Sequence, residues 1–366
     1  MPQRWRIETL SAAPLAVPLR DPFVIASGRV DVTPNVLIRV AVRDLAAHAL
    51  AEGWGEAATL PPVTSETPTA VFAALGALTL PIDLTDDASL PAACAGLGPC
   101  ARAGLEVAVL DAVGQLLRLP LGLLIAPEAV WPPAPITSDI TLAIAAPMTM
   151  AGWATDFAAR GFTAFKVKVG RAIDDDLAAL RAIASTVPGC TLRIDANGGY
   201  TLAEALRLCD AIAADRLPVT CFEQPCATAD LAAMAAVRRA AASCAPIAVL
   251  ADESCKSLGD LDRILDLGAA DGINLKLVKS GGIRACLQIG RAAQAAGLLL
   301  MVGAMVETRV GIVAAAHLTA ALGGVAYPDL DTAWLLADHP CAAAADDLGP
   351  LVKPGPAGWA GPGLGR

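Results

Sequence analysis

TAFKVKVG, residues 163–170, is a short apolar run that carries two lysines, and five runs of the same kind follow it. Each is rich in aliphatic residues and includes a charged residue near its end. The five are TLRIDANG (191–198), VTCFEQP (219–225), IAVLADES (247–254), GINLKLVKSGG (272–282) and LLLMVGAMVE (298–307). The charged residues recur every 24 to 31 residues, which is enough chain for one helix, two loops and one strand. The spacing therefore predicts repeated β–α units.

Eight strands are predicted after a proline-rich break, WPPAPIT, at residues 131–137. They span 138–144, 164–169, 191–195, 219–223, 247–251, 272–276, 298–302 and 325–329. Strands that alternate with helices over this length close most simply into a parallel barrel of the TIM type. The alternative is an open doubly wound sheet, but that fold needs a glycine-rich phosphate loop after its first strand, and the sequence has none there.

The first part of the chain lacks this alternation of strands and helices. Residues 1 to about 60 read as strands, the second and third of which form a hairpin, and residues 68–119 read as helix. We therefore expect an α/β protein in three parts. These are an α+β capping domain (1–134), a barrel (135–332) and a C-terminal segment (333–366) that returns to the capping domain.

Composition excludes several classes of function. The 366-residue chain has a net charge of −9 and no basic stripe, which argues against a nucleic-acid partner. No apolar run reaches the ~20 residues that span a bilayer, and the first residues lack a signal-peptide pattern, so we expect a cytoplasmic protein. The ten cysteines form no CxxC pair and are expected to be reduced. An alanine-rich apolar surface would permit a homo-oligomer.

Three acids end consecutive predicted strands and are candidate metal ligands. Because Asp195, Glu223 and Asp252 all lie at the same end of the barrel, their carboxylates can converge on one point. Three carboxylates would repel one another unless a cation lay between them, and ligation by oxygen alone suits Mg²⁺. The three histidines are too dispersed to form a histidine-rich site. Alternatively, each carboxylate caps the helix that follows its strand.

Three lysines are candidate acid/base catalysts. Lys166 and Lys168 lie two residues apart on one strand, so both face the barrel interior, and Lys276 ends a strand four units later, across the barrel. A lysine beside Mg²⁺ and other cations loses proton affinity, so two such lysines could remove and return a proton at one carbon. The alternative is that they are counter-ions for the acids. We expect Lys279 to be a solvated surface charge.

Six motifs together resemble the enolase superfamily, in its muconate-lactonizing subgroup. The motifs are KVKVG, DANGGY, FEQP, ADES, INLKLVKSGGI and MVETRVGIVAAAHLTAA. The resemblance covers nearly the whole chain, including GWGEA near its start, and implies a modified TIM barrel, (β/α)7β, with a capping domain. It also implies a lysine base and Mg²⁺ that stabilises an enediolate, as is general for this superfamily.

The same resemblance implies a role for each site residue. The implied Mg²⁺ ligands are Asp195, Glu223 and Asp252, the implied catalysts are Lys168 and Lys276, and the implied further site residues are Lys166, Asn197 and Glu307. Lys166 would hold the substrate carboxylate and lower the pKa of Lys168.

Within the subgroup, the chain is similar to dipeptide epimerases of the L-Ala-D/L-Glu type. The similarity lies in PPVTSETP (61–68) and in the DxD motif of Asp329 and Asp331, and Thr141 matches a substrate contact. A carboxylate pair suits the α-ammonium group of a dipeptide, although acidic turns are also common. The implied reaction is a two-base 1,1-proton transfer that inverts the α-carbon of the C-terminal residue through an enediolate.

One position departs from the glutamate-specific pattern. The arginine that grips the glutamate side chain falls on Gly28 in this chain, with Arg29 one residue later. Either Arg29 substitutes for it as a substrate-binding residue, or the pocket accepts a neutral or apolar side chain. We therefore expect a dipeptide substrate whose C-terminal residue is not necessarily glutamate.

Three other classes of function remain open at this point. N-acylamino acid racemase, o-succinylbenzoate synthase and muconate cycloisomerase could share the lysines and the metal, but their substrates offer no ammonium group to Asp329 and Asp331. A Schiff-base aldolase would use Lys276 or Lys168 as nucleophile, survive EDTA and be trapped by borohydride. The third is a catalytically inactive binding or structural protein.

Overall fold

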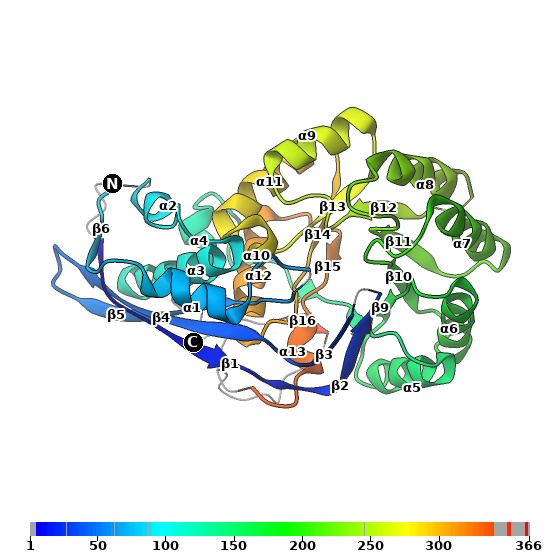
Figure 1. Ribbon diagram of the computed structural model, residues 1–366, viewed down its shortest axis with the longest axis horizontal. Helices are drawn as coiled ribbons and strands as arrows, with labels where there is room; N and C mark the ends of the chain where they lie inside the picture. The colour runs from blue at the N-terminus through cyan, green and yellow to red at the C-terminus, as the bar shows by residue number, and fades with distance from the viewer. Residues whose placement is uncertain are drawn as a thin grey trace.

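A computed structural model describes residues 5–26, 28–61, 63–86, 88–244, 246–339, 350–352 and 363–364. Two regions lie side by side (Figure 1): an antiparallel sheet covered by helices, and a curled parallel sheet with helices around its outer face. The parallel sheet carries most of the predicted site residues.

The parallel sheet has eight strands, and their order in space follows their order in the chain. The strands are β8 (Ile140–Leu142), β9 (Ala164–Lys168), β10 (Thr191–Asp195), β11 (Val219–Glu223), β12 (Ala248–Ala251), β13 (Gly272–Leu275), β14 (Leu299–Val302) and β15 (Tyr327–Pro328). The predicted boundaries differ from these by at most two residues. The prediction was accurate because most of these strands are short, largely buried and rich in apolar residues, with polar turns between them.

A helix follows each of the first seven strands, as a (β/α)7β barrel requires. These helices are α5 (Pro147–Ala158), α6 (Ile173–Thr186), α7 (Leu202–Ala214), α8 (Leu231–Cys244), α9 (Leu258–Leu267), α11 (Ile283–Ala295) and α12 (Arg309–Leu322). Short helices α10 (Leu277–Ser280) and α13 (Thr332–Leu335) follow β13 and β15. Local chemistry sets the helix starts: Thr201 and Glu204 form a capping box at α7. The predicted modified TIM barrel is confirmed.

The first and last strands of the sheet meet at a seam. Within the described residues, β8 and β15 stand at the two ends of the strand order, and three backbone N–H groups of the β8 segment are satisfied one by one across the seam. The pairs are Asp139 N to Pro328 O (3.3 Å), Thr141 N to the Asp331 carboxylate, and Ile144 N to Val24 O (2.9 Å). The seam therefore depends on a carboxylate and on strand β2 (Pro18–Ile25) as well as on β15.

The antiparallel region is built from the N-terminal part of the chain. Its sheet has the order β5-β4-β1-β6, with β1 (Trp5–Leu15), β4 (Asn35–Asp44), β5 (Leu50–Ala57) and β6 (Ile82–Leu84). Its helices are α1 (Pro68–Gly76), α2 (Ser89–Ala93), α3 (Pro99–Leu117) and α4 (Leu121–Ile125). The predicted hairpin is β4–β5. A second hairpin, β2 (Pro18–Ile25) with β3 (Gly28–Val32), was not predicted.

Glycines in GWGEA let helix α3 approach strand β5 closely. A Cβ at Gly55 would overlap the backbone carbonyl of Gly104 on α3, so no other residue fits there without a shift. The next residue, Glu56, then reaches the barrel. Its carboxylate accepts hydrogen bonds from Thr308 N (2.9 Å) and Gly311 N (3.1 Å) at the start of α12. A capping residue supplied by one region thus fixes a helix of the other.

The C-terminal residues that the structure describes touch both regions. Strand β16 (Leu351–Val352) pairs with β7 (Ile136–Thr137) beside the barrel. Leu364 N donates to Asp111 Oδ1 on α3 at 2.9 Å. Residues 340–349, 353–362 and 365–366, which belong to the predicted returning segment, lie outside the described residues.

Two expectations drawn from composition can be compared with the structure. In the part of the chain that it describes, no helix has both the length and the apolar character needed to span a membrane. The nine cysteines of that part carry free thiols, and eight of them are buried, as predicted for reduced cysteines.

His317 is a buried histidine with a packing role. It lies on α12, its ring stacks on Trp131 with centroids 5.6 Å apart, and its Nδ1 accepts a hydrogen bond from Gly122 N at 3.3 Å. Burial lowers the pKa of His317 from 6.5 to about 3. The residue is therefore neutral in the folded protein at neutral pH.

Replacing His317 should flatten the dependence of stability on pH. The unfolded chain binds a proton near pH 6.5 and the folded protein only near pH 3, so stability is lost as the pH falls through this window. Between pH 7 and pH 5 the loss from this group is about 2 kcal/mol. We expect His317→Phe to lack this loss of stability between pH 7 and pH 5. Urea unfolding series of the wild type and the variant at both pH values measure the difference. His48→Asn, at an exposed loop position, is the control, and a wild-type slope in His317→Phe would contradict the prediction.

Candidate active site

Two lysines and three carboxylates gather at the carboxyl ends of consecutive strands. Lys166 and Lys168 lie on β9, Asp195 and Glu223 are the last residues of β10 and β11, and Asp252 directly follows β12. All five side chains are buried. Because neighbouring parallel strands end at the same edge of the sheet, the structure brings these residues together as the sequence repeats predicted.

Lys166 lies among three carboxylates. Its Nζ is 2.7 Å from Glu223 Oε2, 2.7 Å from Asp329 Oδ2 and 3.3 Å from Asp195 Oδ2. Burial alone would lower the pKa of Lys166, but these carboxylates raise it well above its ordinary value. Burial and Asp195 in turn raise the pKa of Glu223 to about 7, against the opposing effect of Lys166. Lys166 is thus the central positive charge of the group.

Lys168 and Lys276 approach the group from opposite sides. Lys168 Nζ contacts Asp195 Oδ2 at 2.6 Å, whereas Lys276 Nζ contacts Asp252 Oδ2 at 2.7 Å. Lys168 ends β9 and Lys276 follows β13, four strands along an eight-stranded curled sheet. Burial alone would lower the pKa of Lys276, but Asp252 outweighs burial and raises it. Asp252 thus favours the charged form of Lys276 in this structure, and the lowering expected for a lysine beside Mg²⁺ stays a prediction.

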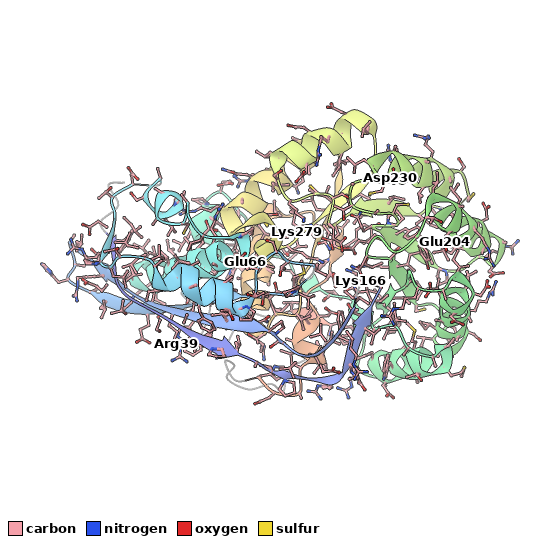
Figure 2. The ribbon with its side chains drawn as sticks, viewed as in Figure 1. Arg39, Glu66, Lys166, Glu204, Asp230 and Lys279 are labelled. Atoms are coloured by element: carbon pink, nitrogen blue, oxygen red, sulfur yellow. The ribbon has the colours of Figure 1, made fainter. Side chains whose placement is uncertain are left out.

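A cavity of about 400 Å³, including its mouth, lies against both lysines. Lys166, Lys168, Lys276, Asp329 and Asp331 line its polar side. The opposite side is apolar and comes from the N-terminal region: Phe23, Ile25, Leu60 and Val63. In Figure 2, Lys166 lies closer to the middle of the molecule than Glu204 and Asp230 do. The lysines therefore face a chamber between barrel and N-terminal region.

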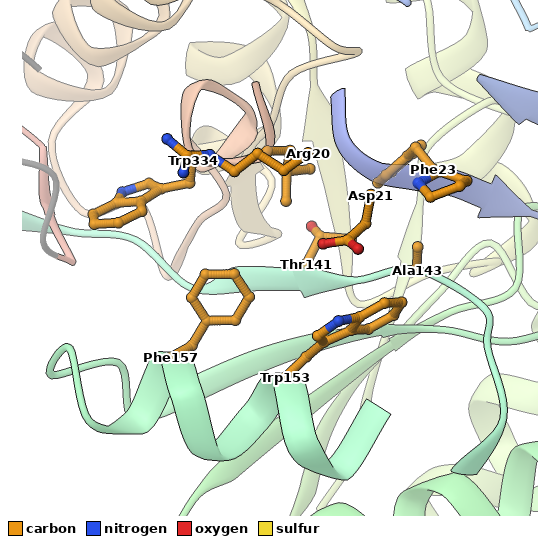
Figure 3. Close-up of a pocket in the computed structure, with 10 residues that line it drawn as sticks. Arg20, Asp21, Phe23, Thr141, Ala143, Trp153, Phe157 and Trp334 are labelled. Carbon is orange, nitrogen blue, oxygen red and sulfur yellow. The ribbon is translucent and has the colours of Figure 1, made fainter. Parts of the chain in front are cut away.

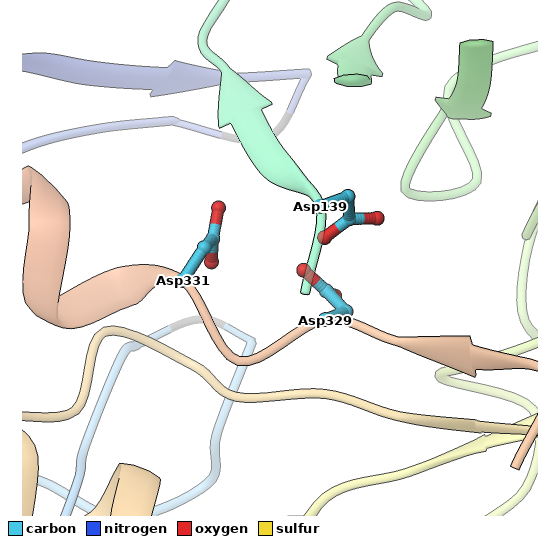
Figure 4. A group of neighbouring side chains, drawn as sticks. All are labelled: Asp139, Asp329 and Asp331. Carbon is cyan, nitrogen blue, oxygen red and sulfur yellow. The ribbon is translucent and has the colours of Figure 1, made fainter. Parts of the chain in front are cut away.

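Asp139, Asp329 and Asp331 form a compact acidic cluster at the seam (Figure 4). One side-chain oxygen from each lies within 4.8 Å of the others. Asp139 pairs with Arg193 Nη1 at 2.7 Å, and Asp331 accepts the Thr141 N–H. Burial and Asp329 raise the pKa of Asp331 to about 6. The sequence analysis found the pair but missed Asp139, which directly precedes β8 and lies two residues before Thr141.

The three predicted metal ligands are less tightly gathered. Among the described residues, the acids grouped within 4.8 Å are those of the seam and not Asp195, Glu223 and Asp252. The reason is that lysine ammonium groups lie between them. Lys166 contacts the first two, and Lys276 contacts the third. All three acids thus border the same group of lysines, and their convergence on one cation stays a prediction.

The expectation for Lys279 was wrong, because this side chain is buried. Its Nζ donates to the Asp252 carboxylate (2.7 Å), to Asp252 O (2.6 Å) and to Asn274 O (2.7 Å). The short helix α10 turns the chain back at Gly281 and Gly282, whose φ angles are +78° and +136°. Such a turn folds Lys279 inward, and the adjacent glycines in KSGG were the available signal.

Two amides missed by sequence analysis hold the acids in place. Gln224 Oε1 accepts from Asp252 N (3.0 Å) and Ser254 N (3.2 Å), which fixes the turn after β12. Asn274 Nδ2 donates to Glu223 Oε1 at 2.7 Å. Both amides are fully buried, so Gln224 firmly holds the backbone at Asp252, and Asn274 firmly holds the Glu223 carboxylate.

Arg29 does not lie at the cavity. It is exposed and pairs with Asp31 at 2.8 Å. The register of β2 with β3 places Arg29 opposite Val24, whereas Phe23 and Ile25, on the other face of β2, line the cavity. In this structure the arginine therefore faces away from the predicted substrate, because one step in register reverses the face of a strand.

Glu307 and Asn197 lie beside the lysines in different ways. Asn197 lines the cavity, and its side chain donates to Glu253 Oε1 at 3.1 Å. Glu307 is buried in the loop before α12, where burial and Glu56 raise its pKa to about 8. Its carboxylate accepts the Met305 N–H, and Met305 lines the cavity. Glu307 therefore shapes the wall of the cavity.

Comparison with known proteins gives matches over most of the chain. The family described as enolase C-terminal domain-like matches residues 149–365. An aromatic dipeptide epimerase from Herpetosiphon aurantiacus is 37% identical over 91% of this chain and 92% of its own. An L-Ala-D/L-amino acid epimerase from Populus trichocarpa is 36% identical over 93% of this chain and 80% of its own. The structure of a Cytophaga hutchinsonii dipeptide epimerase complexed with Mg and D-Ala-L-Val has a TM-score of 0.85, 27% identity, and coverage of 98% and 95%.

Removing the Lys279 ammonium should destabilise the fold. Lys279→Met would leave the Asp252 carboxylate with one cation fewer and two carbonyls without their donor. We expect the free energy of unfolding in urea at pH 7 to fall by about 3 kcal/mol. Lys256→Met removes an exposed lysine nearby and should change it by less than about 0.5 kcal/mol. Equal stability of the two variants would show that Lys279 is not needed as a buried cation.

Proposed function

The chain belongs to the enolase superfamily, and from this premise we propose that it is a Mg²⁺-dependent dipeptide epimerase, an isomerase of the racemase/epimerase kind. The observation that carries the proposal is one cavity that joins Lys168, Lys276 and the Asp329–Asp331 pair. Two amines suit proton transfer at one carbon, and the acidic pair suits the free ammonium group of a peptide.

Asp195, Glu223 and Asp252 are the residues that would hold Mg²⁺. They fit the ion chemically, since they offer carboxylate oxygens at the ends of three neighbouring strands. Their burial requires a compensating cation, which the lysines supply in this structure. A bound Mg²⁺ would act as a Lewis acid on the substrate carboxylate and stabilise the charge that develops when the α-proton leaves.

Lys168 and Lys276 would exchange the α-proton. The lysine on one face of the α-carbon, as a neutral amine, takes the proton from that carbon. The lysine on the other face, as an ammonium, gives a proton back, and the configuration at the carbon is inverted. Lys166 lies between Glu223, Asp195 and Asp329 and would hold the substrate carboxylate by its positive charge.

Asp329 and Asp331 would bind the α-ammonium of the dipeptide. Both are buried in the cavity wall, and Thr141, bonded through its N–H to Asp331, lies beside them. The apolar roof of Phe23, Ile25 and Leu60 excludes water from the carbon that loses its proton. We place Asn197 and Glu307 as supporting residues that hold Glu253 and the Met305 loop.

The remaining parts of the proposal concern domains and compartment. We propose a capping domain at 1–134 and a barrel at 135–332, a division supported by the sheet of β1, β4, β5 and β6 and by the strands β8 to β15. The nine free thiols of the described residues suit a reducing compartment, which supports the cytoplasm.

Single-lysine variants should separate the two halves of the reaction. Lys168→Ala and Lys276→Ala should each lower epimerisation of L-Ala-L-Phe by about 10³-fold or more. Each should still exchange the α-proton for deuterium in D₂O with one stereoisomer, because the opposite lysine remains. Mass spectrometry of the L,L and L,D dipeptides measures this, with Lys256→Ala as an exposed control. Exchange of both stereoisomers by either variant would contradict the assignment of one lysine to each face.

The acidic pair distinguishes a dipeptide epimerase from its rivals on the same scaffold. Asp329→Asn and Asp331→Asn should each lower kcat/KM for dipeptides by about 10- to 100-fold, because each removes a charge-assisted hydrogen bond to the ammonium. Turnover of N-acetylated amino acids, which lack that ammonium, should fall less. Asp156→Asn, on the exposed face of α5, is the control. If both variants keep the wild-type turnover of dipeptides, the result contradicts the dipeptide proposal and favours an N-acylamino acid racemase.

A further inference from the structure

A second hollow opens at the barrel seam, beside the cavity that holds the lysines (Figure 3). The hollow lies between β2, β8, α5 and α13 and measures about 410 Å³ when the open space at its mouth is counted. We call it the seam pocket. Its rings and its charged residues define it: Phe23, Trp153, Phe157, Trp334, Arg20 and Asp21.

The seam pocket adjoins the reaction cavity directly. Phe23 and Thr141 line both hollows. The Phe23 ring lies 5.9 Å from Lys168 Nζ, one of the two amines assigned to the α-carbon. A side chain attached to that carbon can therefore run past Phe23 into the seam pocket, while the carboxylate and the ammonium stay with the lysines and the acidic pair.

The aromatic walls of the seam pocket are fixed by their own packing. Phe157 meets Phe162 edge to face with centroids 5.8 Å apart, and Phe162 meets Trp334 in the same way at 5.5 Å. Arg160 lies over the Trp334 ring at 5.7 Å. Phe157 and Trp334 are therefore held in place before a ligand enters, and aromatic rings favour contact with another ring.

The charges at the mouth balance one another. Arg20 and Asp21 are adjacent, exposed and of opposite sign. Arg20 Nε donates to Leu336 O at 2.8 Å, and Figure 3 shows the Asp21 carboxylate over the pocket beside Thr141. Arg29, the other arginine of the hairpin, pairs with Asp31 on the outer face. These charges therefore favour neither an anionic nor a cationic substrate side chain. The aromatic walls determine which side chain the pocket binds.

We propose that the seam pocket binds the side chain of the residue whose α-carbon is inverted and that it selects a neutral aromatic ring. Trp153 and Phe157 are the specificity-determining residues. This inference rests on the proposed dipeptide epimerisation and names its substrate class: dipeptides that end in phenylalanine, tyrosine or tryptophan.

The test compares dipeptides that differ only in the second side chain. Values of kcat/KM from α-proton exchange in D₂O are measured for L-Ala-L-Phe, L-Ala-L-Ala, L-Ala-L-Glu and L-Ala-L-Lys. We expect L-Ala-L-Phe to exceed each of the others by about tenfold or more. Trp153→Ala should lower the ratio of L-Ala-L-Phe to L-Ala-L-Ala about tenfold. Leu335→Trp, which fills the pocket, should lower the same ratio.

A matched control variant and the choice of substrates separate failure of the specificity inference from failure of the proposed function. Met148→Ala truncates an exposed residue of the same helix, α5, and should keep the wild-type ratio. Preference for glutamate or lysine, or an unchanged ratio in both pocket variants, overturns the inference and leaves the epimerase intact. Exchange with no dipeptide at all overturns the proposed function and the inference with it. If Trp153→Ala does not fold by thermal melting, Leu335→Trp decides.

Discussion

The pairing of buried charges inside the barrel is the constraint on which the rest of the structure depends. Four ammonium groups lie in its interior, and each contacts at least one carboxylate at 2.7 Å or closer. A buried charge without a partner is costly, so every strand end that carries a lysine must face one that carries an acid. The arrangement that satisfies these charges also places two amines on opposite sides of one cavity.

The seam between β8 and β15 connects this charge network to the architecture. Asp331 accepts a backbone N–H of β8 and also lines the reaction cavity, so the same carboxylate closes the barrel and borders the substrate. Strand β2 continues the seam, because Val24 O accepts a hydrogen bond from Ile144 N. The neighbouring Phe23 ring lies close to Lys168. A hairpin from the N-terminal region thus completes both the barrel and the wall of the site.

Sequence reasoning identified the features that depend on local pattern. The strands were predicted closely because buried apolar runs end at charged residues, and the catalytic candidates followed from those ends. Features that depend on tertiary contacts were missed. Lys279 is turned inward by a glycine turn, Asp139 joins the acidic cluster only when the seam closes, and the face of Arg29 follows from the register of an unpredicted hairpin.

The central claim is that one divalent cation unites Asp195, Glu223 and Asp252 while Lys168 and Lys276 face one carbon from opposite sides. Anomalous diffraction from crystals grown with Mn²⁺ and a dipeptide tests it most directly. The account predicts a single anomalous peak bordered by those three acids, with the α-carbon of the dipeptide between the two amines. A peak among Asp139, Asp329 and Asp331, or both amines on one side of the carbon, would contradict it.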